Sequence, residues 1–497
     1  MTSDRRLIIA SNRLPISVAV DGDSVSVRPS AGGLVTAMEP ILSKTAGVWI
    51  GWCGLPGNPP AVLSEIATFS SGAGFDLAPV ALDAEEITNF YSGFSNAIIW
   101  PLFHDLQSLC DFQPAYWHTY QRIADRFAAA IEAVATPADI LWVHDYHLMG
   151  VGARCKARGL QNPCMFFLHI PFPPADIFLK LPWRKEVMDE LLAYDLVGFQ
   201  STRDLKNFVD TYNVLYKQNI QYQDGRVTVS IRDKKIVVGS FPIAIDFHEF
   251  ETQAKTPEII ERAQQVRADA QVEKIILSVD RLDYTKGIPY RIKAYRRLLE
   301  KYPELRKRIV LMQVVVPSRS EVDQYQLLKS NIDGLVTEVN GEFGEVGWTP
   351  VQHFFRSISR EELLSLYLAA DICLVTPLKD GMNLVCKEYC VSHYDDGGRL
   401  ILSEFAGAAE EIGSFAVLVN PYDIDGVADA LSAVIHEPVE VQRAEMERLR
   451  AQLLKKDVFA WARSFLEAAG ISGAAAFLGY EEHETIWSKL WRKVMFE

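Results

Sequence analysis

The sequence predicts an α/β protein with two domains, each built on a mainly parallel sheet covered by helices. Short apolar runs, typical of buried parallel strands, alternate along the chain with segments that carry apolar residues at three- and four-residue steps. The chain has 497 residues, which is more than one ordinary hydrophobic core holds together. A polar and charged stretch at 246–272 separates the two runs of alternating elements, so we place the domain boundary near 245–250.

The first domain is expected to span residues 1–245. Its strands are predicted from six apolar runs: Leu7–Ala10, Val48–Trp52, Ile140–Val143, Met165–Leu168, Leu196–Phe199 and Ile236–Phe241. Helical patterns lie between them, for example at Tyr116–Val134. Gly32 and Gly33 precede a further helical stretch, 35–42, and two glycines at a helix start let a ligand approach the backbone closely. Because the surrounding residues form neither a G-x-G-x-x-G nor a Walker motif, this indication is weak by itself.

Two strand ends in the first domain carry unusual polar side chains. His144, Asp145 and His147 follow one strand, and His169 follows the next. In doubly wound sheets, ligands bind beyond the carboxyl ends of the strands. The histidines could be buried core residues or metal ligands, but no cysteine or further carboxylate has matching metal-ligand spacing. We therefore favour the interpretation that these residues form a polar surface that binds a sugar. Nearby Tyr91 and Trp100 could add apolar faces, although such residues more often belong to the core.

The second domain is expected to span residues 246–455 and to be Rossmann-like, as the first is. Its predicted strands are Ile275–Val279, Ile309–Val316, Ile372–Val375, Leu400–Leu402 and Ala416–Val419. Its predicted helices are Pro257–Asp269, Ile288–Leu299, Arg360–Leu368, Ile424–His436 and Val441–Leu453. Residues 456–497 are expected to form a C-terminal helical segment, within which 456–470 is an amphipathic helix. We assign no function to the tail, 471–497.

The stretch Asp380–Glu388 is the most informative part of this second domain. Pro377 ends an apolar strand, Asp380 is a suitable N-cap residue, and 382–389 contains good helix formers. A helix that begins there points unpaired N–H groups and a partial positive charge at whatever lies beyond the strand, which makes an anion site. Asp380, Asn383 and Glu388 supply more polar groups than a capped turn needs, although a capped turn alone remains possible.

Cations follow two strands of the second domain. Arg281 and Lys286 come after the strand at 275–279, and Arg319 comes after the strand at 309–316. An arginine fork and a lysine point charge suit a diphosphate. Single arginines and lysines are usually solvated surface groups, but three of them at strand ends beside Asp380 favour a phosphate site.

Charge and cysteine content limit the partners and the compartment. The formal net charge is −14, which argues against a nucleic-acid or membrane-surface protein. The seven cysteines form no C-x-x-C pair, which favours reduced thiols in a cytoplasmic protein. We find neither a signal-peptide pattern nor an apolar segment long enough to span a bilayer.

The ordered motifs resemble the retaining glycosyltransferases of family 20, the trehalose-6-phosphate synthase family. The resemblance covers about residues 6–470. It is carried by Ser11–Arg13, Ala31–Leu34, Phe94–Pro101, His144–His147, Phe167–Pro173, Arg281–Gly287, Pro317–Arg319, Asp380–Val385 with Glu388, and Ser403–Ala409. It implies a GT-B architecture, in which two Rossmann-like domains face each other across a cleft and a final helix crosses back to the first domain. The implied reaction transfers glucose from a nucleotide-glucose to glucose 6-phosphate with retention of the anomeric configuration.

The resemblance also implies roles for individual residues. The donor would be bound by Gly33, His169, Arg281, Lys286, Ile358, Asp380, Gly381, Met382, Asn383, Leu384, Val385 and Glu388. The acceptor and its phosphate would be bound by Arg13, Tyr91, Trp100, Asp145 and Arg319. The residues expected to act in catalysis are Asp145, His169, Arg281, Lys286 and Asp380. The family is thought to do without a carboxylate nucleophile, because the acceptor hydroxyl attacks on the face from which the leaving group departs. No cofactor and no obligatory metal are expected.

Several alternatives stay open at this point. The family reads the base largely through backbone groups near Ile358, so UDP-glucose is favoured as donor while GDP- and ADP-glucose are possible. A glucosylglycerol-phosphate synthase-like enzyme would use another phosphorylated acceptor. A catalytically silent sugar-phosphate sensor is expected to lose Arg281, Lys286 or Asp380, and all three are present. A separate phosphatase would complete the pathway, and a homo-oligomer is possible.

Overall fold

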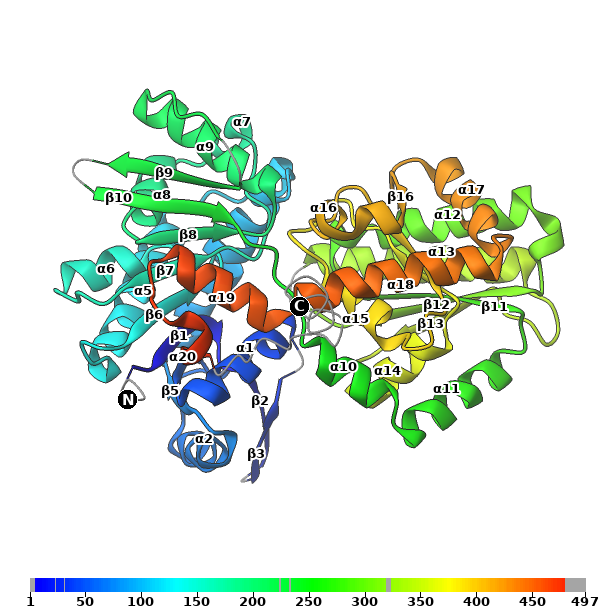
Figure 1. Ribbon diagram of the computed structural model, residues 1–497, viewed down its shortest axis with the longest axis horizontal. Coiled ribbons are helices and arrows are strands. Elements are labelled where there is room, and N and C mark those ends of the chain that lie inside the picture. The colour runs from blue at the N-terminus through cyan, green and yellow to red at the C-terminus, as the bar shows by residue number, and fades with distance from the viewer. Residues whose placement is uncertain are drawn as a thin grey trace, which may run out of the picture.

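Two sheets, each covered by helices, form the molecule in the computed structural model (Figure 1). The structure describes residues 5–22, 24–30, 32–222, 225–231, 234–318 and 323–478. The first sheet lies within residues 7–240 and the second within 274–419. Within these described ranges, no helix is long and apolar enough to cross a membrane.

The first sheet has eight strands in the order β5-β4-β1-β6-β7-β8-β10-β9. Their bounds are β1 Leu7–Arg13, β4 Val48–Trp52, β5 Asp76–Pro79, β6 Ile140–His144, β7 Cys164–Phe167, β8 Leu196–Phe199, β9 Arg226–Ile231 and β10 Lys234–Ser240. All neighbours pair in parallel except β9 and β10, which form an antiparallel edge. The six expected strands are confirmed, and β5 and β9 are additions that the sequence analysis did not foresee. A separate hairpin, β2 (Ile16–Asp21) and β3 (Ser24–Pro29), was also not foreseen.

Helices connect and cover these strands. They are α1 Gly33–Thr45, α2 Pro60–Ala73, α3 Ala84–Glu86, the π-helix Ile87–Ile99, α4 Trp100–Phe103, α5 Pro114–Val134, α6 Val151–Ala157, α7 Ala175–Phe178, α8 Arg184–Leu191 and α9 Thr202–Tyr216. The expected helix at 116–134 is confirmed as α5. Its apolar side buries Tyr120, Ile123 and Phe127 against the sheet and the π-helix.

The second sheet has six parallel strands in the order β13-β12-β11-β14-β15-β16. Their bounds are β11 Lys274–Arg281, β12 Ile309–Val316, β13 Val351–Phe355, β14 Ile372–Val375, β15 Arg399–Ser403 and β16 Val417–Val419. The helices of this half are α10 Phe247–Ala254, α11 Pro257–Ala270, α12 Ile288–Lys301, α13 Asp323–Phe343, α14 Arg360–Ala369, α15 Leu384–Ser392, α16 Ala409–Ile412, α17 Ile424–Ile435 and α18 Val439–Lys455. The five expected strands are confirmed, and β13 was missed.

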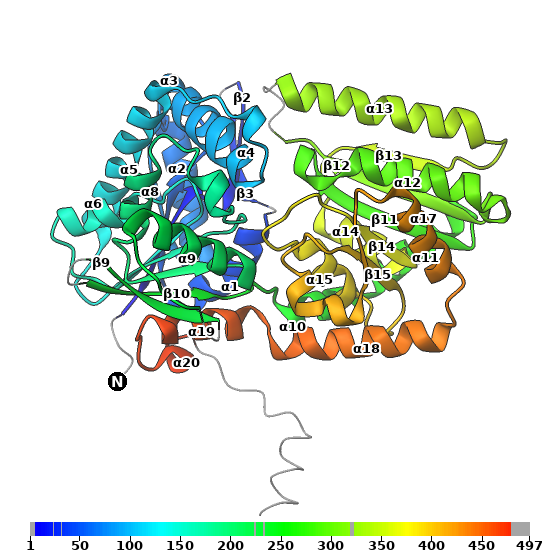
Figure 2. The same cartoon turned by 90° about the horizontal axis from the view of Figure 1, so that it is seen from above.

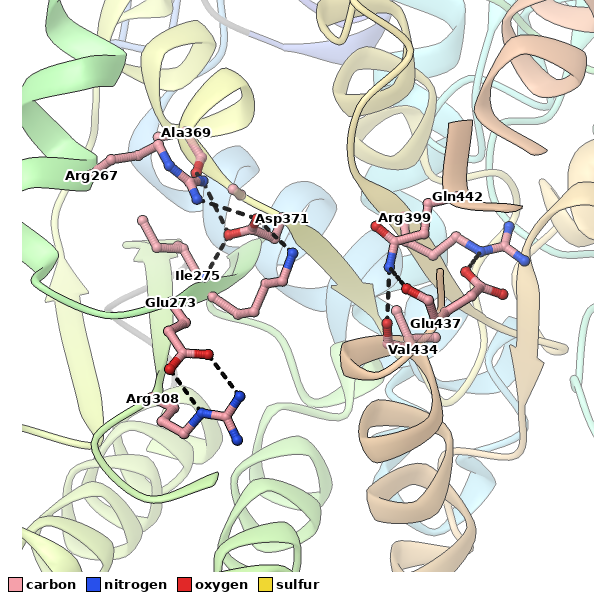
Figure 3. Close-up of polar contacts among 12 residues, drawn as sticks. Arg267, Glu273, Ile275, Arg308, Ala369, Asp371, Arg399, Val434, Glu437 and Gln442 are labelled. Atoms are coloured by element: carbon pink, nitrogen blue, oxygen red, sulfur yellow. Dashed lines mark hydrogen bonds and ion pairs between the residues drawn. The ribbon is translucent and has the colours of Figure 1, made fainter. Parts of the chain in front are cut away.

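Polar contacts close the amino ends of these strands (Figure 3). Asp371, just before β14, accepts a hydrogen bond from the Ile275 amide at 2.9 Å and pairs with Arg267 and Lys274. Arg399, at the start of β15, donates to Glu437 at 3.0 Å. These charged groups pair with one another at the amino ends of the strands. In sheets of this kind ligands bind at the opposite, carboxyl ends.

The chain returns to the first sheet after α18, as expected for residues 456–478, whereas residues 479–497 of the expected helical segment lie outside the described residues. Helix α18 runs along the second half, and α19 (Val458–Ala468) crosses to the first, where α20 (Ala474–Phe477) follows (Figures 1 and 2). Trp461 donates its indole N–H to the Phe241 carbonyl at 3.1 Å, and Phe465 stacks on Trp142 with ring centroids 4.6 Å apart. A Cβ at Gly198 would lie 2.4 Å from the Phe465 ring, so glycine lets α19 pack directly on β8. The two sheets and this returning helix confirm the predicted fold class.

Candidate active site

The carboxyl ends of strands from the two sheets approach each other closely. A Cβ at Gly381, which follows β14, would lie 2.3 Å from the carbonyl oxygen of His169, which follows β7. A Cβ at Gly33, at the start of α1, would lie 3.0 Å from Leu384 of α15. Asp105 of the first half also pairs with Lys379 of the second at 2.6 Å. The structure therefore brings together predicted site residues that are hundreds of positions apart in the sequence.

The loop before α15 differs from the expectation in one respect. The prediction that Asp380 is the N-cap of this helix is wrong, because α15 begins at Leu384 and Asn383 is its cap. The Asn383 side chain accepts from the Cys386 amide at 3.1 Å, and Asn383 has φ 93°. Backbone hydrogen bonds to 405–408 hold residues 380–382 beside the loop after β15, so the helix cannot start earlier.

Asp380 instead forms an ion pair with Lys286 at 2.6 Å and accepts from the side-chain NH₂ of Asn383 at 3.3 Å. The Lys286 and Asp380 side chains are 12% and 15% exposed. Burial raises the pKa of the Asp380 carboxyl, but the Lys286 charge and hydrogen bond outweigh it and hold this pKa below its ordinary value. The carboxylate is therefore ionised, and it holds the Lys286 ammonium beside the loop 380–383, which precedes α15.

Arg281, at the end of β11, has a different environment from Lys286. Its side chain is exposed, and it makes no hydrogen bond or ion pair with any other residue that the structure describes. Of the two cations predicted to bind a diphosphate, Lys286 is thus paired with a carboxylate, whereas Arg281 has no partner among the described residues. An uncommitted guanidinium can use its whole fork of donors on an incoming phosphate.

The beginning of α15 supplies further groups. Leu384 and Val385 are its first two residues, and helix geometry leaves their N–H groups without an intrahelical acceptor. One turn later, Glu388 accepts from the Tyr367 hydroxyl at 2.9 Å. Burial raises the pKa of Glu388. Met382 is buried, whereas Ile358, in the segment between β13 and α14, is partly exposed.

The opposite wall is formed by the polar residues after β6 and β7. Asp145 has φ 73°, a left-handed conformation that aspartate tolerates better than most residues. Its carboxylate accepts from the His169 amide at 3.2 Å. The His169 ring lies 3.0 Å from the His144 ring, measured from Nε2 to Nδ1. Burial lowers the pKa of His169 to about 3, so its ring is neutral near pH 7.

Aromatic rings extend this wall towards Arg13. The Arg13 guanidinium lies 4.5 Å from the Trp52 ring centroid, and Trp52 meets the edge of Tyr91 at 6.0 Å. Tyr91 in turn stacks on His147 at 6.0 Å. Trp100 is buried beside Tyr146, with centroids 5.7 Å apart. Arg319, the other expected acceptor cation, lies outside the described residues.

Three groups at this site were not singled out from the sequence as functional. Gln200 bonds to His169, Asp105 pairs with Lys379, and Lys387 of α15 is buried against Glu411. Each is an ordinary polar residue whose partner is distant in the chain. The π-helix that carries Tyr91 was also missed, although π turns are frequent at functional sites.

Comparison with known proteins decides the family. The family model for glycosyltransferase family 20 matches residues 5–470. The chain belongs to glycosyltransferase family 20.

Members of this family with similar sequences are trehalose-6-phosphate synthases of mycobacteria. One from Mycobacterium sp. (strain JLS) is 41% identical over 476 residues, which cover 94% of this chain and 96% of the relative. Another, from Mycolicibacterium smegmatis, is 40% identical over 495 residues, covering 97% of this chain and 96% of the relative.

Solved family structures also share the fold. An α,α-trehalose-phosphate synthase (UDP-forming) from Burkholderia xenovorans in complex with glucose-6-phosphate has a TM-score of 0.84 and 32% identity, covering 94% of this chain and all of the other. An E. coli structure bound with UDP-2-fluoro glucose has a TM-score of 0.83 and 33% identity, covering 93% of this chain and 98% of the other.

Proposed function

We propose that this family 20 glycosyltransferase is a trehalose-6-phosphate synthase. It transfers glucose from UDP-glucose to glucose 6-phosphate, giving α,α-trehalose 6-phosphate and UDP with retention at the anomeric carbon. Full-length similarity to enzymes of that name supports the reaction, and the related structures with glucose-6-phosphate and with UDP-2-fluoro glucose support the two substrates. The single observation that carries the proposal is the close approach of Gly381 to His169, which sets the Lys286–Asp380 pair against the polar wall at Asp145.

The donor side would act mainly by electrostatics. Cleavage of the glycosidic bond leaves negative charge on the departing diphosphate. Arg281, Lys286 and the first amides of α15 would stabilise that charge, with Gly33 allowing the diphosphate to lie against the start of α1. His169 and the loop 380–383 would hold the glucose. Phosphate or ribose would be contacted by Leu384, Val385 and Glu388. The segment at Ile358 would contact the base.

The acceptor side would position the attacking hydroxyl. Arg13 and Arg319 would bind the acceptor phosphate, and Tyr91 and Trp100 would flank the sugar. Asp145 would orient the acceptor and not attack the anomeric carbon, and the His169 amide would help to hold its carboxylate in place. The hydroxyl would attack on the face from which the diphosphate departs. The proposal assigns no metal, so a chelator should leave turnover unchanged.

The cellular setting is part of the proposal. The seven cysteines are free thiols, which suits the reducing cytoplasm. A separate phosphatase would release trehalose, and a homo-oligomer is compatible with the fold. Neither nucleic acid nor membrane is assigned as a partner.

A product assay tests the proposed function. Purified enzyme is incubated with UDP-, GDP- or ADP-glucose and with glucose 6-phosphate, glycerol 3-phosphate or unphosphorylated glucose, and the product is identified by NMR, which also gives its anomeric configuration. UDP-glucose with glucose 6-phosphate should be fastest and should give the α,α product. Fastest turnover with glycerol 3-phosphate would indicate a glucosylglycerol-phosphate synthase, and no turnover with any pair would indicate a sensor.

A further inference from the structure

A chain of buried polar groups stands behind His169. The backbone amide of Ile243 lies 3.0 Å from Oε1 of Gln200, and Nε2 of Gln200 lies 3.3 Å from Nδ1 of His169. Nε2 of His169 lies 3.0 Å from Nδ1 of His144. Gln200 is 2% exposed and His144 is completely buried. With so little solvent to compete, these groups bond to one another, and Nε2 of His144, at the far end, has no hydrogen-bond partner among the described residues.

The direction of every hydrogen bond follows from one end of the chain. A peptide N–H can only donate, so the Gln200 oxygen must face Ile243 and the Gln200 NH₂ must face His169. Nδ1 of His169 is then an acceptor. A neutral His169 must therefore carry its proton on Nε2 and donate it to Nδ1 of His144.

Both rings are expected to be neutral. Burial lowers the pKa of His169 to about 3 and lowers that of His144 well below its ordinary value. Two protonated imidazoles with nitrogens 3.0 Å apart would also repel each other. The neighbouring carboxylate of Asp145 accepts from the His169 backbone amide.

We propose that Gln200 is a positioning residue that fixes His169 as its Nε2–H tautomer and holds its ring in place at the donor site. The role of His169 towards the donor glucose rests on the proposed function, whereas the tautomer follows from the hydrogen bonds alone. Both ring nitrogens are then engaged, because Nε2–H donates to His144 and Nδ1 accepts from Gln200, so His169 would meet the donor glucose with its ring face or its backbone and not with a free ring nitrogen. The His169 amide is fixed by Asp145 at 3.2 Å, so backbone and ring are both immobilised.

The anchor of this arrangement is the segment that joins the two sheets. Ile243 lies between β10, which ends at Ser240, and α10, which begins at Phe247. While its N–H serves Gln200, its carbonyl accepts from Lys387 of α15 at 2.8 Å. Lys387 is completely buried and is paired with Glu411. The residue that orients Gln200 is thus held from the second half of the molecule, next to Glu388 in the donor-binding helix.

The Gln200→Glu substitution tests the proposal because it keeps the shape but reverses one bond. A glutamate carboxylate still accepts from the Ile243 amide, but it cannot donate to His169. Nδ1 of His169 should then gain a proton, giving either the Nδ1–H tautomer or imidazolium. The matched control is Gln442→Glu, because Gln442 is also buried (7% exposed) and donates to the backbone carbonyls of Val434 and Glu437, near Arg399 at the amino end of β15 (Figure 3).

Tautomers are read from long-range ¹H–¹⁵N spectra of protein labelled with ¹⁵N-histidine, without substrate, and His169 is assigned from the His169→Gln spectrum. The parent and Gln442→Glu should show the Nε2–H form, and Gln200→Glu should show Nδ1 protonated with kcat at least 10-fold lower. An Nδ1–H form in the parent, or an unchanged His169 signal in Gln200→Glu, would overturn the proposal. If Gln200→Glu does not fold, the parent spectrum alone still decides the tautomer. Absence of trehalose 6-phosphate synthesis would refute the proposed function and leave the tautomer result intact.

Discussion

Replacing Lys286 with alanine should lower both turnover and stability. The Lys286 ammonium lies 2.6 Å from the Asp380 carboxylate, and both side chains are largely buried. Losing one charged contact to the departing diphosphate should cost about 3 kcal/mol of transition-state stabilisation, or roughly 100-fold in kcat. Removing one partner of a largely buried ion pair also leaves an uncompensated charge, which should cost about 3 kcal/mol of folding free energy.

Arg281→Ala should separate these two effects. Arg281 has no ion pair with another described residue, so its loss should lower kcat by a similar factor without lowering the midpoint of thermal unfolding. Lys301→Ala is a matched control at the far end of α12, because Lys301 forms an exposed ion pair with Asp429, and the loss of such a pair should leave stability nearly unchanged.

The assay is kcat for UDP release together with the unfolding midpoint, which should fall by roughly 5 °C or more in Lys286→Ala only. Near-normal turnover in folded Lys286→Ala or Arg281→Ala would refute the donor assignment. Unchanged stability in Lys286→Ala would refute the structural role of the pair.

Three further variants test other parts of the structure. Gly381→Ala would place a Cβ 2.3 Å from the His169 carbonyl, so it should cut kcat at least 10-fold and enlarge the radius of gyration in small-angle scattering. In the control Gly334→Ala the added Cβ meets nothing within 4 Å, so neither quantity should change. Equal behaviour of the two variants would contradict the close contact. Burial raises the pKa of Asp204 to about 6, above its unfolded value near 3.8, so ionisation of Asp204 should destabilise the fold progressively from about pH 4 to 6, by up to about 3 kcal/mol. Asp204→Asn should flatten that part of the stability profile measured by urea unfolding, and an unchanged profile would count against the shift. Arg319→Ala, which rests on the sequence alone, should weaken binding of glucose 6-phosphate by about 2 kcal/mol. Its KM should then rise roughly 30-fold, while KM for UDP-glucose changes little. Undiminished discrimination against unphosphorylated glucose would argue against a phosphate contact.

The parallel strands were predictable because each is a short apolar run between turn residues, and burial on both faces requires such runs. Strand β13, with Gln352 and His353 in its middle, lacks that pattern and was missed. Strand β5 has only four residues and ends at Pro79, so its edge position is clear only once β4 is in place.

The candidate site was predictable to the extent that its chemistry sits at strand ends. Arg281, Lys286 and Asp380 were expected there from their position after apolar runs. The ion pair between Lys286 and Asp380 was not expected, because it joins residues 94 positions apart. The N-cap prediction for Asp380 failed for a related reason, since the hydrogen bonds that delay the helix come from the loop after another strand.

Gly381 shows how these long-range contacts make one site from two sheets. On one side its Cα faces the His169 carbonyl, where a Cβ would lie at 2.3 Å. On the other side its own carbonyl lies against Gly407, where a Cβ would come within 1.9 Å. The loop 380–383 is therefore held between the first half of the molecule and the loop after β15. Its close contacts are to backbone atoms, so no side-chain rotation could relieve them. Lys286, Asp380 and Gly381 belong to the same half, so a shift between the halves would leave their ion pair intact but would separate it from His169 and Asp145. Under the proposed function, both halves must therefore be in contact before the groups assigned to the donor and those assigned to the acceptor can act on the same reacting atoms.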